Sequence, residues 1–105
     1  LIKNDFDNAF SNVDVIMTPT TRGPAFDIGS KGSDPIQMYL EDLFTISANL
    51  AGLPAMSVPN GSIDGKPIGL QIIGNFLDES SILNFAHMYQ TQTNWHMHTP
   101  EGVKK

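Results

Sequence analysis

Three short apolar segments, each bounded by proline or glycine, constrain the fold of this chain more than any other feature. They are residues 13–19 (VDVIMTP), 54–59 (PAMSVP) and 67–74 (PIGLQIIG). Their lengths and their prolines indicate β-strands, because proline cannot donate a hydrogen bond inside a sheet and therefore stands at strand ends. Strands that are apolar almost throughout are typical of a sheet covered by other elements on both faces.

Helical patterns separate these strands. The first helix places its apolar residues on one face, at Ile2, Phe6, Ala9, Phe10 and Val13. A second helix is predicted over residues 35–51. Asp34 is a favourable N-cap, Pro35 suits the first helical position, and Gly52 suits the C-terminal cap. The segment between the first strand and this helix, residues 20–33, is predicted to be a long loop.

The second half of the chain is predicted to form a hairpin and a last helix. Asn60-Gly61 and Asp64-Gly65 supply turn residues, which predicts a hairpin with a loop of about seven residues between the second and third strands. Asp78 is the expected N-cap of a helix over residues 79–91. The inner face of that helix is formed by Ile82, Phe85, Ala86 and Tyr89. The tail from Trp95 onward shows no regular pattern.

The order of these elements, α-β-loop-α-β-β-α, predicts an α/β fold with a mixed sheet between helices. With few strands and apolar faces on both sides, residues 1–105 are expected to form one margin of a larger α/β/α sandwich. A length of 105 residues suits one domain and is too short for two. The first residue is Leu1, and the chain opens inside a predicted helix, so we expect a piece of a longer protein. Charged residues interrupt the first ten positions, which excludes a signal peptide there.

The charge balance argues against direct contact with nucleic acid. Six basic residues stand against eleven acidic ones, for a net charge of −5, and the basic residues are scattered. A nucleic-acid surface needs a basic patch that displaces counterions from phosphates. The absence of cysteine excludes disulfides and thiolate metal sites, and fits a cytoplasmic protein. No apolar run reaches the roughly 18 residues that span a bilayer.

Asp42 is the most informative polar residue. On the predicted helix, its neighbours at helical spacing are Met38, Tyr39 and Ile46, all apolar or aromatic. A carboxylate on such a face needs a cation or several donors, because its burial alone is very costly. Glu41, one position away, is expected to be the solvated member of the pair. Spacing alone leaves open whether Asp42 binds a ligand, pairs with a structural arginine, or lies in water at the edge of the face.

Other candidate sites are weaker. His87, His96 and His98 lack the ligand spacing of a zinc site and are expected on the surface, so we assign no metal. Ser80 and Ser81 lie at a helix start, where serine is a common capping residue, and no base is placed to activate them. Neither GxGxxG nor GxxxxGK[ST] occurs, so no phosphate-binding loop is predicted.

Four ordered blocks resemble those of the amidase-signature enzymes. They are residues 14–20 (DVIMTPT), 34–39 (DPIQMY), 49–59 (NLAGLPAMSVP) and 65–74 (GKPIGLQIIG). The last two are similar to motifs shared across that family. The DPIQMY block resembles the helix start of the A subunits of tRNA-dependent amidotransferases.

The resemblance implies a fold and a reaction. The fold is an α/β/α sandwich with a mixed sheet, and the reaction is amide hydrolysis by a Ser–cis-Ser–Lys triad. In the A subunits the amide is glutamine, and the ammonia serves to amidate Glu-tRNA(Gln) or Asp-tRNA(Asn) in a complex with the B and C subunits. ATP and Mg are used there through the B subunit, so no cofactor is expected on this chain. The glycine-rich serine loop and the lysine of the triad are absent from this sequence, so we expect no catalytic residue in it.

The resemblance also implies a role for Asp42. It occupies the position of the carboxylate that receives the α-ammonium of bound glutamine, a charge-assisted contact that selects amino-acid amides. The arginine that would hold the glutamine carboxylate lies outside this sequence. Arg22 departs from the small residue or proline usual at its position and is interpreted as a loop variant. The alternative function is a stand-alone amidase that hydrolyses small amides without a partner.

Overall fold

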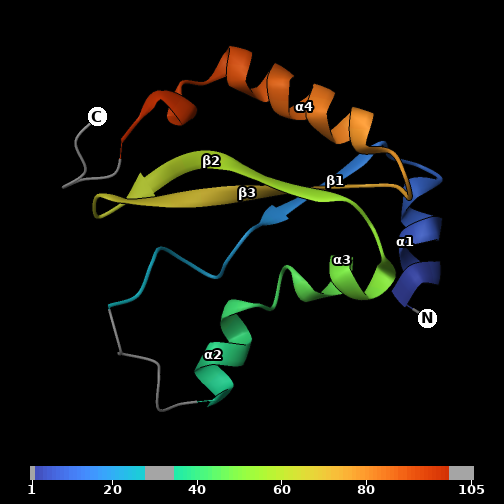
Figure 1. The fold of residues 1–105 in the computed structure, drawn as a ribbon, viewed down its shortest axis with the longest axis horizontal. Coiled ribbons are helices and arrows are strands. Elements are labelled where there is room, and N and C mark those ends of the chain that lie inside the picture. Colours follow the sequence, from blue (N-terminus) through green and yellow to red (C-terminus); the bar gives the residue numbers. More distant parts are fainter. Residues whose placement is uncertain (1, 28–34, 100–105) are drawn as a thin grey trace.

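The computed structural model describes residues 2–27 and 35–99 (Figure 1). Its elements follow the predicted order, with one expected helix divided in two. They are α1 (Ile2–Phe10), β1 (Val15–Pro19), α2 (Pro35–Glu41), α3 (Ile46–Ala51), β2 (Ala55–Ile63), β3 (Lys66–Gly74), α4 (Glu79–Gln92) and a single 3₁₀ turn, η1 (Trp95–Met97). The expected N-cap Asp34 lies outside the described residues. No helix in the described ranges is long and apolar enough to cross a membrane.

The strands form a sheet in the order β1-β3-β2, so β3 lies in the middle. Both pairs are antiparallel, with Val15 opposite Gly74 on one side of β3 and Ala55 opposite Ile73 on the other. The α/β class expected from the sequence is confirmed. The parallel pairing that a mixed sheet also contains does not occur among the described strands.

The hairpin between β2 and β3 is tighter than the sequence predicts. β2 continues to Ile63, and only Asp64 and Gly65 form the turn, where a loop of about seven residues was expected. Both turn residues have positive φ, 53° and 79°, as a two-residue hairpin turn of the right twist requires. Asn60-Gly61 makes a register shift within the pair instead of a turn, because Gly61 with φ 143° absorbs the irregularity and pairing resumes at Ser62.

The helix expected over residues 35–51 is interrupted. α2 ends at Glu41, residues 42–45 form turns, and α3 begins at Ile46. The Asp42 carbonyl accepts hydrogen bonds from the amides of both Thr45 and Ile46, each at 3.1 Å. These two hydrogen bonds close the turn between α2 and α3. The C-terminal cap is as predicted: Gly52 adopts φ 69°, and its amide donates to carbonyls of the preceding turn.

Two apolar layers cover the two faces of the sheet, as expected from the strand patterns. Figure 1 shows α4 on one side of the strands and α3 on the other. On the α4 side the buried residues are Val58, Ile72, Ile82 and Ala86. On the other side they are Ala48, Ala51, Leu53 and Ile73, with Phe6, Phe10 and Ile16 packed against them. The neighbours Ile72 and Ile73, at 0% and 2% exposure, point to opposite faces of β3 and belong to different layers.

The predicted apolar face is confirmed for the last helix and is wrong at one residue for the first helix. Ile82 and Ala86 of α4 are buried, with Phe85 and Tyr89 packed beside them, which confirms the predicted inner face. Val13 was expected on the apolar face of the first helix, and this expectation is wrong. α1 ends at Phe10, so Val13 lies in the connection to β1 and is 46% exposed.

Gly74 allows α4 to approach the end of β3. A Cβ atom there would lie 2.7 Å from the Ile82 side chain and 3.2 Å from the Asp78 backbone oxygen. We expect Gly74→Ala to lower the free energy of unfolding by about 1–3 kcal/mol, because the helix must move away from the strand. Urea unfolding of the chain measures this change. Gly23→Ala is the matched control, since no atom lies within 4 Å of its added Cβ; equal effects of the two substitutions would contradict the packing argument.

Candidate functional site

Asp42 lies at an open groove beside the sheet. The groove has a volume of about 360 Å³ and is lined by residues 20, 21 and 23–26 after β1, by Glu41 and Asp42 at the end of α2, and by parts of β2 and β3. The sequence predicted Asp42 on an apolar helical face. In the structure it follows α2 directly, in the turn, and its side chain is exposed. Its predicted neighbours Tyr39 and Ile46 are themselves 57% and 36% exposed.

The relation between the two acidic residues differs from the expectation. Glu41 was expected to be the solvated one, but it is half-buried, whereas Asp42 is exposed. Glu41 lines the same groove as Asp42 and also a smaller hollow together with Arg22, so its carboxylate borders both spaces. The reason is the end of α2 at Glu41, which takes Asp42 out of the helical position on which the expectation was based.

The sheet contributes two hydroxyl groups to the groove. Thr20 Oγ1 and Ser57 Oγ lie 2.7 Å apart and share a hydrogen bond, although they come from segments 37 residues apart. They meet above Gly69 of β3, where a Cβ atom would lie 2.6 Å from Ser57 Oγ and 2.8 Å from Thr20 Oγ1. The Thr20 amide also donates to the Gly69 carbonyl at 3.1 Å. Glycine at this strand position is therefore needed for the close approach of the two hydroxyls.

Gln71 connects the sheet to the turn that carries Asp42. Its side chain is only 3% exposed. The Nε2 atom donates to the Phe44 carbonyl at 2.7 Å and to Thr18 Oγ1 at 2.8 Å. The sequence patterns considered above did not single out this residue. The available signal was a lone polar side chain within the apolar segment PIGLQIIG, which must find partners when it is buried.

Lys66 holds the segment that follows β1 against the hairpin. Its Nζ atom donates to the Ala25 carbonyl at 3.1 Å and lies 3.6 Å from Asp27 Oδ1. Because the Asp27 side chain is 89% exposed, water screens this ion pair. The hydrogen bond to the Ala25 carbonyl therefore contributes more to the position of this segment. The groove is thus lined by two carboxylates, Glu41 and Asp42, and by the Thr20 and Ser57 hydroxyls, a set of acceptors suited to an ammonium group.

The other polar candidates lie elsewhere. Ser80 and Ser81 occupy the first turn of α4, where the Ser80 hydroxyl donates to Asp78 at 3.4 Å. Asp78 stands at the N-cap position, but its side chain makes no capping hydrogen bond. His87, His96 and His98 are all exposed. Within residues 2–27 and 35–99, no three histidine, aspartate or glutamate side chains gather as metal ligands would.

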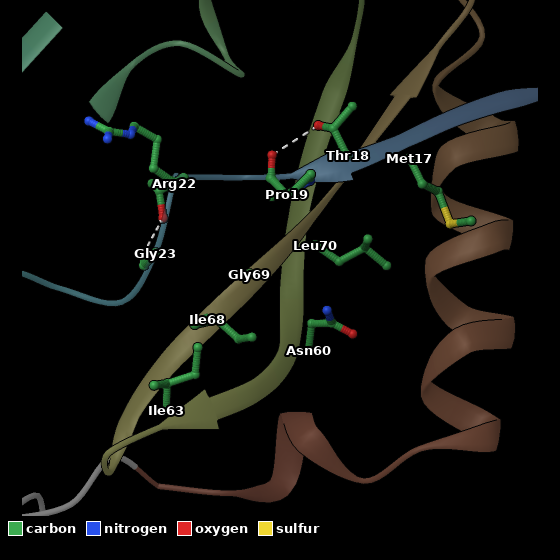
Figure 2. Close-up of a pocket in the computed structure, with 11 residues that line it drawn as sticks. Met17, Thr18, Pro19, Arg22, Gly23, Asn60, Ile63, Ile68, Gly69 and Leu70 are labelled. Carbon is green, nitrogen blue, oxygen red and sulfur yellow. Dashed lines mark hydrogen bonds between the residues drawn. The ribbon is translucent and has the colours of Figure 1, made fainter. Parts of the chain in front are cut away.

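A second cavity of about 320 Å³ lies at the end of β1, over the hairpin (Figure 2). Its lining is mainly apolar and includes Met17, Ile63, Ile68 and Leu70. Asn60 contributes an amide, which accepts a hydrogen bond from the Tyr89 hydroxyl of α4. No acidic side chain among the described residues lines this cavity. Arg22 also lines it. The groove at Asp42 is therefore the better candidate for binding a positively charged ligand.

The chain matches a family model and several known proteins. The family model for Amidase matches residues 1–83. The chain is 59% identical, over 99% of its length, to the A subunit of the glutamyl-tRNA(Gln) amidotransferase of Saccharophagus degradans, and 56% identical to the same subunit of Cellvibrio japonicus. It covers 22% of each of these relatives, so it spans about a fifth of their length.

Solved structures give the same family. The crystal structure of the glutamyl-tRNA(Gln) amidotransferase A subunit from Thermotoga maritima matches 98% of this chain with a TM-score of 0.88 and 37% identity, and the match covers 23% of that protein. A 6-aminohexanoate cyclic dimer hydrolase matches 94% of this chain with a TM-score of 0.80 and 27% identity, again over 23% of the other protein. With the family model matching most of its length, the chain belongs to the amidase family.

Proposed function

We propose that this chain is part of the glutaminase subunit of a tRNA-dependent amidotransferase. That subunit hydrolyses glutamine, and the ammonia serves to convert Glu-tRNA(Gln) to Gln-tRNA(Gln), or Asp-tRNA(Asn) to Asn-tRNA(Asn). The observation that carries the proposal is 59% identity over 99% of the chain to the A subunit of a glutamyl-tRNA(Gln) amidotransferase. The higher TM-score for the Thermotoga maritima protein than for the hydrolase, 0.88 against 0.80, supports the same choice.

Within this function we assign substrate binding to Asp42. The α-ammonium of glutamine carries a positive charge and three donors, and the lining of the groove offers the Asp42 carboxylate, with Glu41 beside it, and the Thr20–Ser57 hydroxyl pair. A hydrogen bond between two charged groups is stronger than a neutral one and favours amides that bear an α-amino group. The exposed side chain of Asp42 is accessible to such a ligand.

The remaining functions belong to other parts of the proposed complex. The Ser–cis-Ser–Lys triad is assigned to a portion of the longer protein outside this sequence, so this chain supplies substrate-pocket and scaffold residues. The B and C subunits of the amidotransferase are the proposed partners. ATP and Mg are assigned to the B subunit, and contact with tRNA to the partner subunits, in accord with the net charge of −5 on this chain. Because the proposed complex serves translation, we assign it to the cytoplasm.

A stand-alone amidase is the second candidate. The likeness to a 6-aminohexanoate cyclic dimer hydrolase favours it, because that protein shares the fold at 27% identity. Such an enzyme hydrolyses its amide without a partner and does not need a carboxylate for an α-ammonium. The two candidates therefore differ in what Asp42 does.

Asp42→Asn in the full-length parent protein separates the candidates. We expect KM for glutamine to rise about 100-fold or more, because the α-ammonium loses its charged partner. Hydrolysis of a simple amide without an α-amino group should be unchanged. Initial rates over a range of glutamine concentrations measure the effect. Asp64→Asn, the same change in an exposed hairpin turn, is the control. An unchanged KM, or equal losses for both amides, would leave only a general amidase assignment.

The chain by itself is expected to hydrolyse no glutamine. Its sequence contains neither the glycine-rich serine loop nor the lysine to which the nucleophilic chemistry is assigned. Ammonia release from glutamine by the purified 105-residue chain measures this directly, with the full-length protein as the positive control. Turnover above a buffer blank would show that the chemistry lies in this part of the protein.

A further inference from the structure

We propose that Gln71 is a positioning residue, which holds the Asp42 carboxylate in place through the turn that follows α2. The proposal rests on the function proposed above, in which Asp42 binds the α-ammonium of the substrate. Gln71 itself is buried in the middle strand and does not line the groove. Its effect on the substrate is therefore transmitted through the backbone of residues 42–45.

The orientation of the Gln71 amide follows from its partners. The Phe44 carbonyl oxygen can only accept, so the group that lies 2.7 Å from it must be the NH₂ of Gln71. The same nitrogen lies 2.8 Å from Thr18 Oγ1, and the Thr18 hydroxyl in turn donates to the Pro19 carbonyl at 2.9 Å. Both amide hydrogens of Gln71 are thus used, one toward the turn and one toward β1.

The turn is closed on one side by its own backbone and tied on the other side to the sheet. The Asp42 carbonyl accepts from the Thr45 and Ile46 amides at 3.1 Å and from the Thr45 hydroxyl at 3.2 Å. These bonds set the shape of the turn. The bond from Gln71 to Phe44, two residues after Asp42, sets where the turn lies above the sheet. Together they determine the place of the Asp42 carboxylate relative to the Thr20–Ser57 hydroxyl pair.

An apolar side chain could pack at position 71 but could not donate a hydrogen bond to the Phe44 carbonyl. The next residues of β3, Ile72 and Ile73, are buried in apolar layers, and an uncompensated amide at such depth is unfavourable. The amide is compensated here by an acceptor in the turn that carries Asp42. The hydrogen bond from the buried Gln71 amide to the turn after Asp42 is the reason to assign Gln71 a positioning role, since a residue that only fills the core would not need it.

Gln71→Met in the full-length parent protein tests the proposal. Methionine keeps the length of the side chain but cannot donate to Phe44 or Thr18. We expect KM for glutamine to rise about tenfold while kcat changes less than about threefold, since the lost interaction acts on binding. Hydrolysis of a simple amide without an α-amino group should be unchanged. Ile72→Val is the matched control, because Ile72 is buried on the opposite face and belongs to the layer under α4.

A double-mutant cycle with Asp42→Asn separates positioning from an independent effect. If Gln71 acts through Asp42, the double variant has the same KM for glutamine as Asp42→Asn alone. Additive effects on KM, or a loss in Gln71→Met that is equal for both amides, would overturn the proposal. If Asp42→Asn raises KM and Gln71→Met does not, the positioning role of Gln71 is refuted, whereas the substrate contact of Asp42 is supported. If Asp42→Asn has no effect, the proposed substrate contact fails and the positioning role with it.

Gln71→Glu keeps the test possible where the methionine variant does not fold. A protonated glutamic acid retains one O–H donor for the Phe44 carbonyl, whereas its carboxylate retains none. The ratio of the KM for glutamine of this variant to that of the wild type should therefore fall as the pH is lowered within the range where the wild-type KM is constant, so that protonation of Asp42 does not contribute. A ratio that is large and independent of pH would contradict a tie through the Phe44 carbonyl.

Discussion

Burial of β3 between two apolar layers is the constraint on which the rest of this structure depends. β3 pairs with β1 on one side and β2 on the other, so its backbone donors and acceptors are used on both edges. Ile72 packs toward α4, and Ile73 packs toward α1 and α3. A strand enclosed in this way leaves no water for a polar side chain, and so the partners of Gln71 must come from the protein itself.

The N-terminal half of β3 also contributes to the groove. Gly69 allows Ser57 of β2 and Thr20, the residue after β1, to meet, because it has no side chain to separate them. Gln71, two residues later on the same face, reaches the turn that carries Asp42. A single strand thus contacts the hydroxyl pair that lines the groove and, through Gln71, the turn that carries Asp42. In the chain by itself the carboxylate is exposed, and water weakens any pairing with a cation.

Several elements were predictable because their signals are local. The strand ending at Pro19, the Gly52 cap and the inner face of α4 follow from proline geometry, positive φ and helical spacing. The hairpin loop was predicted too long, because both Asn60-Gly61 and Asp64-Gly65 favour turns and only strand pairing decides between them. The interruption after Glu41 was not predicted, since the residues there permit a helix and the carbonyl of Phe44 is bound by a side chain 27 residues away.

The sequence by itself determined the family, the α/β class and the choice of Asp42 as the candidate residue, because motifs, periodicity and turn residues are properties of short segments. Only the tertiary structure decided that Asp42 lies in a turn at an open groove, that Glu41 is the more buried of the two carboxylates, that Gln71 bonds to the turn after Asp42, and that Gly69 lies against the Thr20–Ser57 pair. The physical reason is that burial, close approach and side-chain hydrogen bonds join residues far apart in the chain. No local pattern specifies such contacts before the sheet has brought the strands together.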